Sequence, residues 1–171
     1  GKPWVLDPVA IGIGSLRTSM LQQFKAYRPN VIRGNASEIL ALAGLWELEG
    51  GSRTSNARGV DSTDSVAAAK ASAVALAKWT SGAVAVSGET DLVTDGDVVA
   101  YSHGGSHFMN KITGSGCALG GVIAVYAAVA SPFIAAITGH AVFNLAGRRA
   151  EGKANGPGSF QTALLDELYN A

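Results

Sequence analysis

The chain has 171 residues, 47% of them hydrophobic, and its 13 lysines and arginines balance its 13 aspartates and glutamates. A chain of this length can bury a substantial core as one domain, and a net charge of zero provides no field to recruit nucleic acid or an anionic membrane. The single cysteine excludes an internal disulfide framework, and no apolar stretch is long enough to span a bilayer. We therefore expect a single domain over residues 1–171, located in the cytoplasm, with no nucleic-acid or membrane partner.

The first segment, Trp4-Val5-Leu6, is a short apolar strand with nothing before it to pair with it or cover it. This indicates that the sequence is part of a longer protein. Asp7 follows the strand directly, at the edge where open α/β sheets bind their ligands. Its carboxylate either orients a metal ion or fixes the turn through its own backbone.

A helix is expected after this turn, with a serine as its cap and apolar side chains at helical spacing. The cap is Ser15, and the apolar positions are Leu16, Met20, Leu21 and Phe24. A second strand is expected over residues 30–33, and Asn35 and Glu38 then have the spacing of a capping box. In the functional alternative, Arg33 pairs with nucleotide phosphates and Glu38 holds a metal ion or its water shell.

The middle of the chain alternates between helix and strand signals. A polar loop rich in glycine and serine over residues 49–59 leads to an alanine-rich helix over 65–79. Residues 83–86 are an apolar run typical of a buried parallel strand, which ends at Ser87. Ser87 either donates a hydrogen bond to a phosphate or serves only the turn. An Asp-Gly pair at 95–96 then predicts a hairpin.

The most informative stretch is Gly114-Ser115-Gly116-Cys117, which is followed by a small apolar run long enough for a helix. Glycines let the backbone approach a ligand closely, and the first N–H groups of a helix lack carbonyl partners and favour an anion. The stretch therefore predicts an anion hole over residues 114–117. The helix field also favours a thiolate at Cys117, which can act as a base or nucleophile. The alternative is tight packing, with Cys117 as a small buried hydrophobe.

Two further helices are expected, over residues 132–150 and 160–169, with His140 as a structural histidine. Strands alternate with helices along the chain, and polar groups collect where the strands end. This pattern predicts a three-layer α/β domain with a mainly parallel sheet and a site along the carboxyl edge of that sheet.

Several motifs follow one another in a fixed order. They are Leu6-Asp7-Pro8-Val9, Arg33-Gly34-Asn35-Ala36-Ser37-Glu38-Ile39, Gly59-Val60-Asp61-Ser62-Thr63-Asp64, Ser87-Gly88-Glu89, Gly114-Ser115-Gly116-Cys117-Ala118-Leu119 and Gly156-Pro157-Gly158-Ser159-Phe160. In this order the chain resembles the hydroxyethylthiazole kinase family of thiamine biosynthesis. The resemblance covers all 171 residues but corresponds to the later two-thirds of the family's catalytic unit. It implies a ribokinase-like fold whose N-terminal part is absent from this sequence.

The resemblance implies phosphorylation of the hydroxyl of 4-methyl-5-(2-hydroxyethyl)thiazole, with ATP as co-substrate and Mg²⁺ as cofactor. It also implies a homotrimer with sites at the subunit boundaries. The first strands and helices of the family have no counterpart here, so we expect them upstream in the same gene product or on another chain.

The resemblance also implies roles for individual residues. Arg33 and Ser87 would contact ATP, and Gly114 would lie against the thiazole alcohol. Asp7 and Glu38 would organise Mg²⁺ and its waters around the phosphates.

Cys117 stands where sugar kinases of the same fold carry an aspartate base, so the resemblance implies that it accepts the proton of the alcohol. One alternative is another small-alcohol kinase of this fold. A second is a non-catalytic fragment of a bifunctional thiamine-phosphate synthase and thiazole kinase. A third is a hydrolase that pairs Cys117 with His103, His107 or His140.

Overall fold

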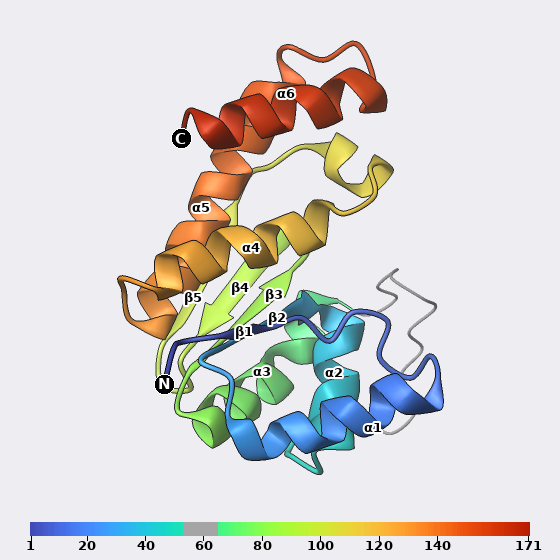
Figure 1. The fold of residues 1–171 in the computed structure, drawn as a ribbon, viewed down its shortest axis with the longest axis vertical. Helices are drawn as coiled ribbons and strands as arrows, with labels where there is room; N and C mark the ends of the chain where they lie inside the picture. The colour runs from blue at the N-terminus through green and yellow to red at the C-terminus, as the bar shows by residue number, and fades with distance from the viewer. Residues whose placement is uncertain (53–64) are drawn as a thin grey trace.

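The computed structural model describes residues 1–52 and 65–171, so the motif at 59–64 lies outside the described residues. This part of the chain forms one five-stranded sheet with helices on both faces (Figure 1). The strands are β1 (Val5–Leu6), β2 (Val31–Asn35), β3 (Ala83–Ser87), β4 (Thr90–Thr94) and β5 (Val99–His103). The helices are α1 (Ser15–Phe24), η1 (Lys25–Tyr27), α2 (Ala36–Leu45), α3 (Val66–Thr80), η2 (His107–Lys111), α4 (Ser115–Ala127), α5 (Pro132–Glu151) and α6 (Pro157–Tyr169). The predicted three-layer α/β architecture is confirmed.

The strands lie in the order β1-β2-β3-β4-β5. β1 pairs in parallel with β2, and β2 with β3, whereas the β3–β4 and β4–β5 pairs are antiparallel. Because two successive antiparallel pairings restore the original direction, β5 runs with β1, β2 and β3, and β4 runs the opposite way. The prediction of a mainly parallel sheet is therefore confirmed, and the carboxyl ends of β1, β2 and β3 meet at one edge.

Alternate side chains of the strands supply two separate cores. On one face, Ile32 and Val84 pack with residues of α2 and α3. On the other face, Val31, Ala85 and Val93 pack with residues of α4 and α5, and α6 covers α5. All five side chains are buried. Because helices cover both faces of the sheet, a ligand can approach the strands only along an edge.

Helix α1 departs from the prediction at its cap and on its apolar face. Gly14, rather than the predicted serine, is the N-cap residue, and no side chain caps the first turn. Leu16 and Met20 are 76% and 47% exposed, and Leu21 is the buried residue of this helix. The Leu21 carbonyl accepts a hydrogen bond from Trp46 Nε1 at 2.9 Å. The core contact of α1 is therefore narrower than its apolar spacing predicts.

The remaining elements lie close to their predicted positions. β4 and β5 form the expected hairpin, and α5 begins at Pro132. α6 begins at Pro157, three residues before its predicted start, because the fixed φ of proline suits the first turn of a helix. Within the described residues, no helix combines the length and the apolar character needed to cross a bilayer.

A buried and an exposed leucine should respond differently to the same substitution. Leu76 on α3 is fully buried, whereas Leu165 on α6 is 60% exposed. We expect Leu76→Ala to lower the free energy of unfolding by about 2 to 5 kcal/mol, because it leaves a cavity in the core. Leu165→Ala should change this free energy by less than about 0.5 kcal/mol. Urea denaturation measures both, and equal losses would contradict the placement of α3 in the core.

Candidate active site

Three polar side chains meet at the carboxyl edge of the sheet. β1 and β3 lie on either side of β2, so Asp7, which follows β1, and Ser87, which ends β3, flank Arg33 on β2. Arg33 Nη1 donates to Asp7 Oδ2 at 2.9 Å, and Arg33 Nη2 donates to Ser87 Oγ at 3.4 Å. The structure thus brings together one metal candidate and both nucleotide candidates from the sequence.

The ion pair between Arg33 and Asp7 is largely removed from water. The Arg33 side chain is 9% exposed and the Asp7 side chain 20% exposed. A charge in such a place is stable only when a counter-charge and hydrogen bonds compensate it. Among the described residues, Arg33 Nε and Asp7 Oδ1 are buried without a hydrogen-bond partner. Unsatisfied polar atoms of this kind call for an explanation, and a polar ligand is one.

The first turn of α4 lies against the same guanidinium group. A Cβ atom on Gly116 would lie 2.6 Å from Arg33 Nη2 and 2.8 Å from Arg33 Nη1, closer than real side chains pack. Gly116 therefore allows the helix backbone to approach Arg33. Gly114, the N-cap of α4, has a φ of 87°, in the left-handed region that favours glycine. The spacing of the two glycines predicts a close approach, but it does not identify the group that is approached.

The start of α4 leaves N–H groups free for an anion. The Ala118 N–H donates to the Gly114 carbonyl at 2.9 Å. The N–H groups of Ser115, Gly116 and Cys117 precede this bond and have no carbonyl partner within the helix. Cys117 is exposed, so the alternative of a small buried hydrophobe is wrong. The predicted anion hole therefore begins beside a buried cation, with a thiol on the solvent side.

Glu38 lies in the first turn of α2 and is 3% exposed. Asn35 Oδ1 accepts the Glu38 N–H at 2.9 Å, and Glu38 Oε2 accepts the Asn35 N–H at 2.8 Å, which confirms the predicted capping box. Glu38 Oε1 accepts the Ala10 N–H at 3.3 Å. Burial raises the pKa of Glu38, and the nearby Asp7 charge adds to this, although the N–H bonds and Arg33 act in the opposite direction. Glu38 thus joins the loop after β1 to α2.

The donor set suits a lightly coordinated Mg²⁺ ion better than a metal held only by protein. The described residues contain no group of three or more His, Cys, Asp or Glu side chains that could hold a metal. Mg²⁺ commonly binds through one or two carboxylates together with phosphates and water. Asp7 fits such a site, because its buried Oδ1 has no partner. Both oxygens of Glu38 already accept a backbone N–H, so only their second lone pairs are available to a metal-bound water.

The three histidines are all in the described part of the chain, and each has a polar neighbour other than Cys117. These neighbours are Thr90 for His103, Glu151 for His107 and Asp91 for His140. A cysteine hydrolase requires a histidine within hydrogen-bond reach of the thiol. The contacts of the described residues provide no such pair, so they give the hydrolase alternative no support.

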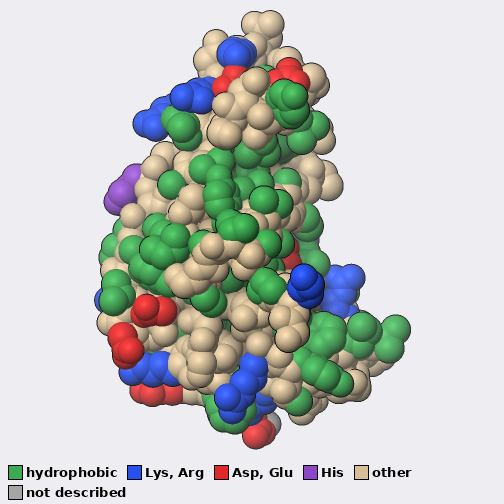
Figure 2. Space-filling view, turned by 60° about the vertical axis from the view of Figure 1, so that its left-hand side comes forward, with side chains coloured by type: hydrophobic (Ala, Val, Ile, Leu, Met, Phe, Trp, Pro, Cys, Tyr) green, Lys and Arg blue, Asp and Glu red, His purple; other side chains and the backbone are tan. Residues whose placement is uncertain are grey.

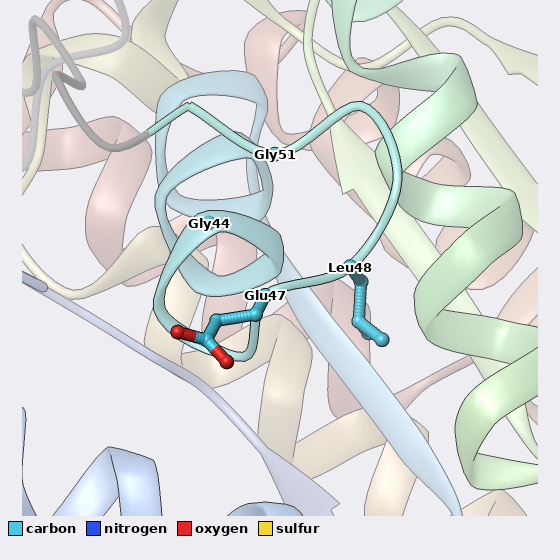
Figure 3. A pocket seen from close by; sticks show the side chains of 4 residues that line it. All are labelled: Gly44, Glu47, Leu48 and Gly51. Atoms are coloured by element: carbon cyan, nitrogen blue, oxygen red, sulfur yellow. The ribbon is translucent and has the colours of Figure 1, made fainter.

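A cavity at the other end of α2 lacks the features of an active site. Its volume is about 270 Å³, and it lies at the carboxyl end of the helix, whereas Glu38 lies at the amino end. Its lining residues are Gly44, Glu47, Leu48 and Gly51 (Figure 3). Among these four lining residues, only Glu47 has a polar side chain, and it points away from that of Leu48 in Figure 3. The edge around Arg33 is therefore the candidate active site.

The fold and this edge define an α/β domain with a candidate active site at the carboxyl ends of parallel strands. The model of the hydroxyethylthiazole kinase family matches residues 1–171. The chain belongs to the hydroxyethylthiazole kinase family.

Individual relatives agree with this assignment. The chain is 50% identical over 187 residues to a hydroxyethylthiazole kinase of Bifidobacterium longum (strain DJO10A), covering 99% of this chain and 60% of the relative. It is 47% identical over 169 residues to one of Cereibacter sphaeroides (strain ATCC 17029 / ATH 2.4.9), covering 99% of this chain and 62% of the relative. The solved structure of a hydroxyethylthiazole kinase protein from Pyrococcus horikoshii OT3 superimposes with a TM-score of 0.82 at 30% identity, over 99% of this chain and 60% of that one. The chain spans about 60% of the length of these relatives.

Two glycines of α4 form a matched pair that tests the contact with Arg33. An added Cβ at Gly121 meets nothing within 4 Å, so Gly121→Ala should raise the free energy of unfolding by about 0.5 to 1 kcal/mol. Gly116→Ala displaces the guanidinium of Arg33, and overpacking of this kind typically costs about 1 to 3 kcal/mol. Urea denaturation should give G121A a higher free energy of unfolding than the wild type, and G116A a lower one. Equal stabilisation by both substitutions would contradict the packing of Arg33 on α4.

The raised pKa of Glu38 predicts the sign of one pH dependence. Above the ordinary pKa of 4.5, the folded state keeps a proton on Glu38 that the unfolded state releases, so this group reduces stability as the pH rises through that window. Glu38→Gln cannot ionise and lacks this contribution. The free energy of unfolding of E38Q, relative to the wild type, should therefore increase as the pH rises from about 4.5. Denaturation curves across this pH range measure the difference in free energy of unfolding between E38Q and the wild type. A difference that does not vary with pH would contradict the raised pKa of Glu38.

Proposed function

We propose that this chain provides the phosphoryl-transfer part of a hydroxyethylthiazole kinase. The reaction would transfer the terminal phosphoryl group of ATP to the hydroxyl of 4-methyl-5-(2-hydroxyethyl)thiazole, for thiamine biosynthesis or salvage. The observation that carries the proposal is the buried Arg33 guanidinium, held against Asp7, Ser87 and Gly116 at the start of α4. A fixed cation beside free helix N–H groups suits phosphate oxygens, and phosphoryl transfer depends mainly on positioning and charge stabilisation. Membership of the family supports the choice of alcohol.

In this proposal, Arg33 and Ser87 contact the phosphates of ATP. The guanidinium keeps N–H donors beyond those directed at Asp7 and Ser87, and its Nε is buried without a partner. The Ser87 hydroxyl, which accepts from Arg33, can donate its own hydrogen to a phosphate oxygen. The N–H groups at residues 114–117 stabilise charge on the moving phosphoryl group.

Asp7 and Glu38 would hold Mg²⁺ and its waters. Asp7 offers the unpartnered Oδ1 as a direct ligand, and Glu38 offers the second lone pairs of its carboxylate to metal-bound water. When bound, the ion neutralises charge on the phosphate oxygens. The Arg33 guanidinium beside Asp7 fixes the direction of that carboxylate.

Cys117 is the proposed base for the alcohol. Gly114 lies against the substrate hydroxyl, whose oxygen attacks the terminal phosphorus while the bond from that phosphorus to the bridging oxygen breaks. The Cys117 thiolate accepts the hydroxyl proton, and the products are ADP and the phosphate ester. Exposure of Cys117 at the first turn of α4 supports this role, because a substrate can reach the thiol.

The proposal includes an assembly that completes the site. Figure 2 shows hydrophobic side chains gathered across the middle of one face of the molecule. α4 and the residues after it contribute exposed apolar side chains, with Val125 at 70%, Val129 at 85% and Ile134 at 50% exposure. Such surface favours contact with further protein. We propose a homotrimer with sites between subunits, and a preceding segment supplied by the same gene product or another chain. The use of ATP supports a cytoplasmic location.

The direct test is an assay of the full-length protein with ATP, Mg²⁺ and the thiazole alcohol. The phosphate ester should form in a 1:1 ratio with ADP, as measured by mass spectrometry, and chelation of the metal should stop the reaction. Thermal stabilisation by Mg-ATP without any ester would instead favour the non-catalytic alternative. Phosphorylation of a pyrimidine, a sugar or vitamin B6 in place of the thiazole would favour another alcohol kinase.

Substitution of Cys117 tests the proposed base. Cys117→Ala should lower kcat by about 10²- to 10⁴-fold, the usual contribution of general-base help, and should leave the Kd for ATP unchanged. Cys117→Asp should retain more activity than Cys117→Ala, because a carboxylate can accept the proton. An inactive C117D beside an active C117A would argue against proton acceptance, and so would a loss of ATP binding in C117A.

A further inference from the structure

A buried polar cluster outside the proposed active site connects α5 to the turn that carries Ser87. Asp91 on β4 is 6% exposed, and His140 and Asn144 on α5 are 1% and 9% exposed. The two α5 residues are four positions apart, so they lie one turn apart on the same helix face. Both side chains reach the carboxylate of Asp91.

One carboxylate oxygen of Asp91 faces the helix. Asp91 Oδ2 accepts a hydrogen bond from Asn144 Nδ2 at 2.8 Å and lies 3.0 Å from His140 Nδ1. Both ring nitrogens of His140 are buried without a hydrogen-bond partner in the described part of the chain, so His140 contacts the carboxylate without donating a hydrogen bond to it. Asn144 Nδ2 also donates to Ser102 Oγ on β5 at 3.1 Å. The cluster therefore ties α5 to both strands of the hairpin.

The other carboxylate oxygen of Asp91 faces the site. Asp91 Oδ1 accepts the N–H of Gly88 at 3.0 Å, and Gly88 directly follows Ser87 in the chain. Ser87 Oγ in turn lies 3.4 Å from Arg33 Nη2. A continuous chain of contacts thus runs from α5 through Asp91 and the Ser87–Gly88 turn to Arg33.

The carboxylate of Asp91 is suited to hold the turn because it stays ionised. Burial alone would raise the pKa of Asp91, but the close approach of the His140 ring, together with the hydrogen bonds from Asn144 and Gly88, outweighs it. The pKa of Asp91 is therefore below its ordinary value. Hydrogen bonds to an ionised acceptor are stronger and shorter than neutral ones, so the Gly88 N–H is firmly held.

We propose that Asp91, held by His140 and Asn144, is a positioning residue for the nucleotide. It fixes the Ser87–Gly88 turn so that the Ser87 hydroxyl stays beside Arg33, where both can contact the phosphates. The inference rests on the proposed contact of Ser87 with ATP. Asp91 itself touches no substrate in this arrangement and acts only through Ser87.

A purely structural role makes different predictions. If the cluster only stabilises the fold, its loss should change the KM for ATP and the KM for the thiazole alcohol alike, with or without the Ser87 hydroxyl. If Asp91 positions Ser87, its loss should change the KM for ATP selectively, and only when the Ser87 hydroxyl is present. A double-substitution cycle separates these two roles.

The experiment uses the full-length protein and the substitutions Asp91→Asn and Ser87→Ala, alone and combined. D91N places an amide donor against the Asn144 donor and beside the His140 ring, so the side chain at position 91 should release Gly88 or rotate. We expect the KM for ATP to rise about tenfold or more in D91N, since small misplacements at a reacting site have effects of this size. The KM for the thiazole alcohol should stay within about twofold. In the S87A background, D91N should add less than about twofold, because the group that Asp91 positions is already absent.

Three further variants distinguish a positioning role from simple misfolding. His140→Gln keeps a polar side chain beside Asp91 and should stay close to the wild type, whereas His140→Leu removes the polar contact and should behave as D91N does. Asp97→Asn is the matched control on the same hairpin, because the Asp97 side chain is 91% exposed and lies 4.0 Å from Lys78. It should leave both KM values unchanged.

Hydrogen exchange at the Gly88 amide gives a readout that needs neither ATP nor turnover. The exchange rate should rise in D91N and H140L but not in D97N. Unchanged exchange, equal changes in both KM values, or additive effects of D91N and S87A in an active enzyme would overturn this inference and leave the proposed kinase function intact. A folded wild type that neither binds ATP nor forms the ester would overturn the proposed function, and this inference with it.

Discussion

The proposed site depends on the burial of one positive charge. A guanidinium removed from water must be compensated by a carboxylate and by hydrogen bonds, and these come from separate parts of the chain. Asp7 supplies the counter-charge, Ser87 supplies a hydroxyl, and Gly116 allows the backbone of α4 to approach. The compensation of Arg33 thus links the ends of three strands to the start of a helix.

The layered fold provides the framework for this compensation. Because β1, β2 and β3 are parallel, their carboxyl ends lie at the same edge, and side chains distant in sequence become neighbours. Helices cover both faces of the sheet, so the strands are fixed by two cores before any polar contact is considered. The proposed chemistry uses this rigidity, since phosphoryl transfer depends on oxygens held in place more than on covalent chemistry.

Much of the fold could be predicted from the sequence, because its signals are local. Apolar runs predict β2 and β3, the Asn35–Glu38 spacing predicts the start of α2, and the Asp-Gly pair predicts the hairpin. The apolar spacing of α1 was misleading, since Leu16 is exposed: periodicity shows which side chains share a face but not what covers that face.

The candidate site was only partly predictable. Its residue types and their places at strand ends could be recognised, and the resemblance to the family gave them roles. The contact of Gly116 with Arg33 could not be foreseen, because a glycine leaves no side-chain signal of the group it admits. Asp91 carried no motif at all. Its proposed positioning role depends on side-chain contacts between β4 and α5, which no local pattern in the sequence indicates.

The short length of β1 affects how the protein unfolds. This strand has two residues, is at the border of the sheet, and is held to β2 through two paired positions, yet it positions the anion that neutralises Arg33. Regions held by few contacts open more readily than a densely packed interior. If this edge strand detached, the Arg33 guanidinium would remain buried without its counter-charge, while the two hydrophobic cores stayed intact. Heat or denaturant should therefore disrupt the proposed active site before the two hydrophobic cores unfold.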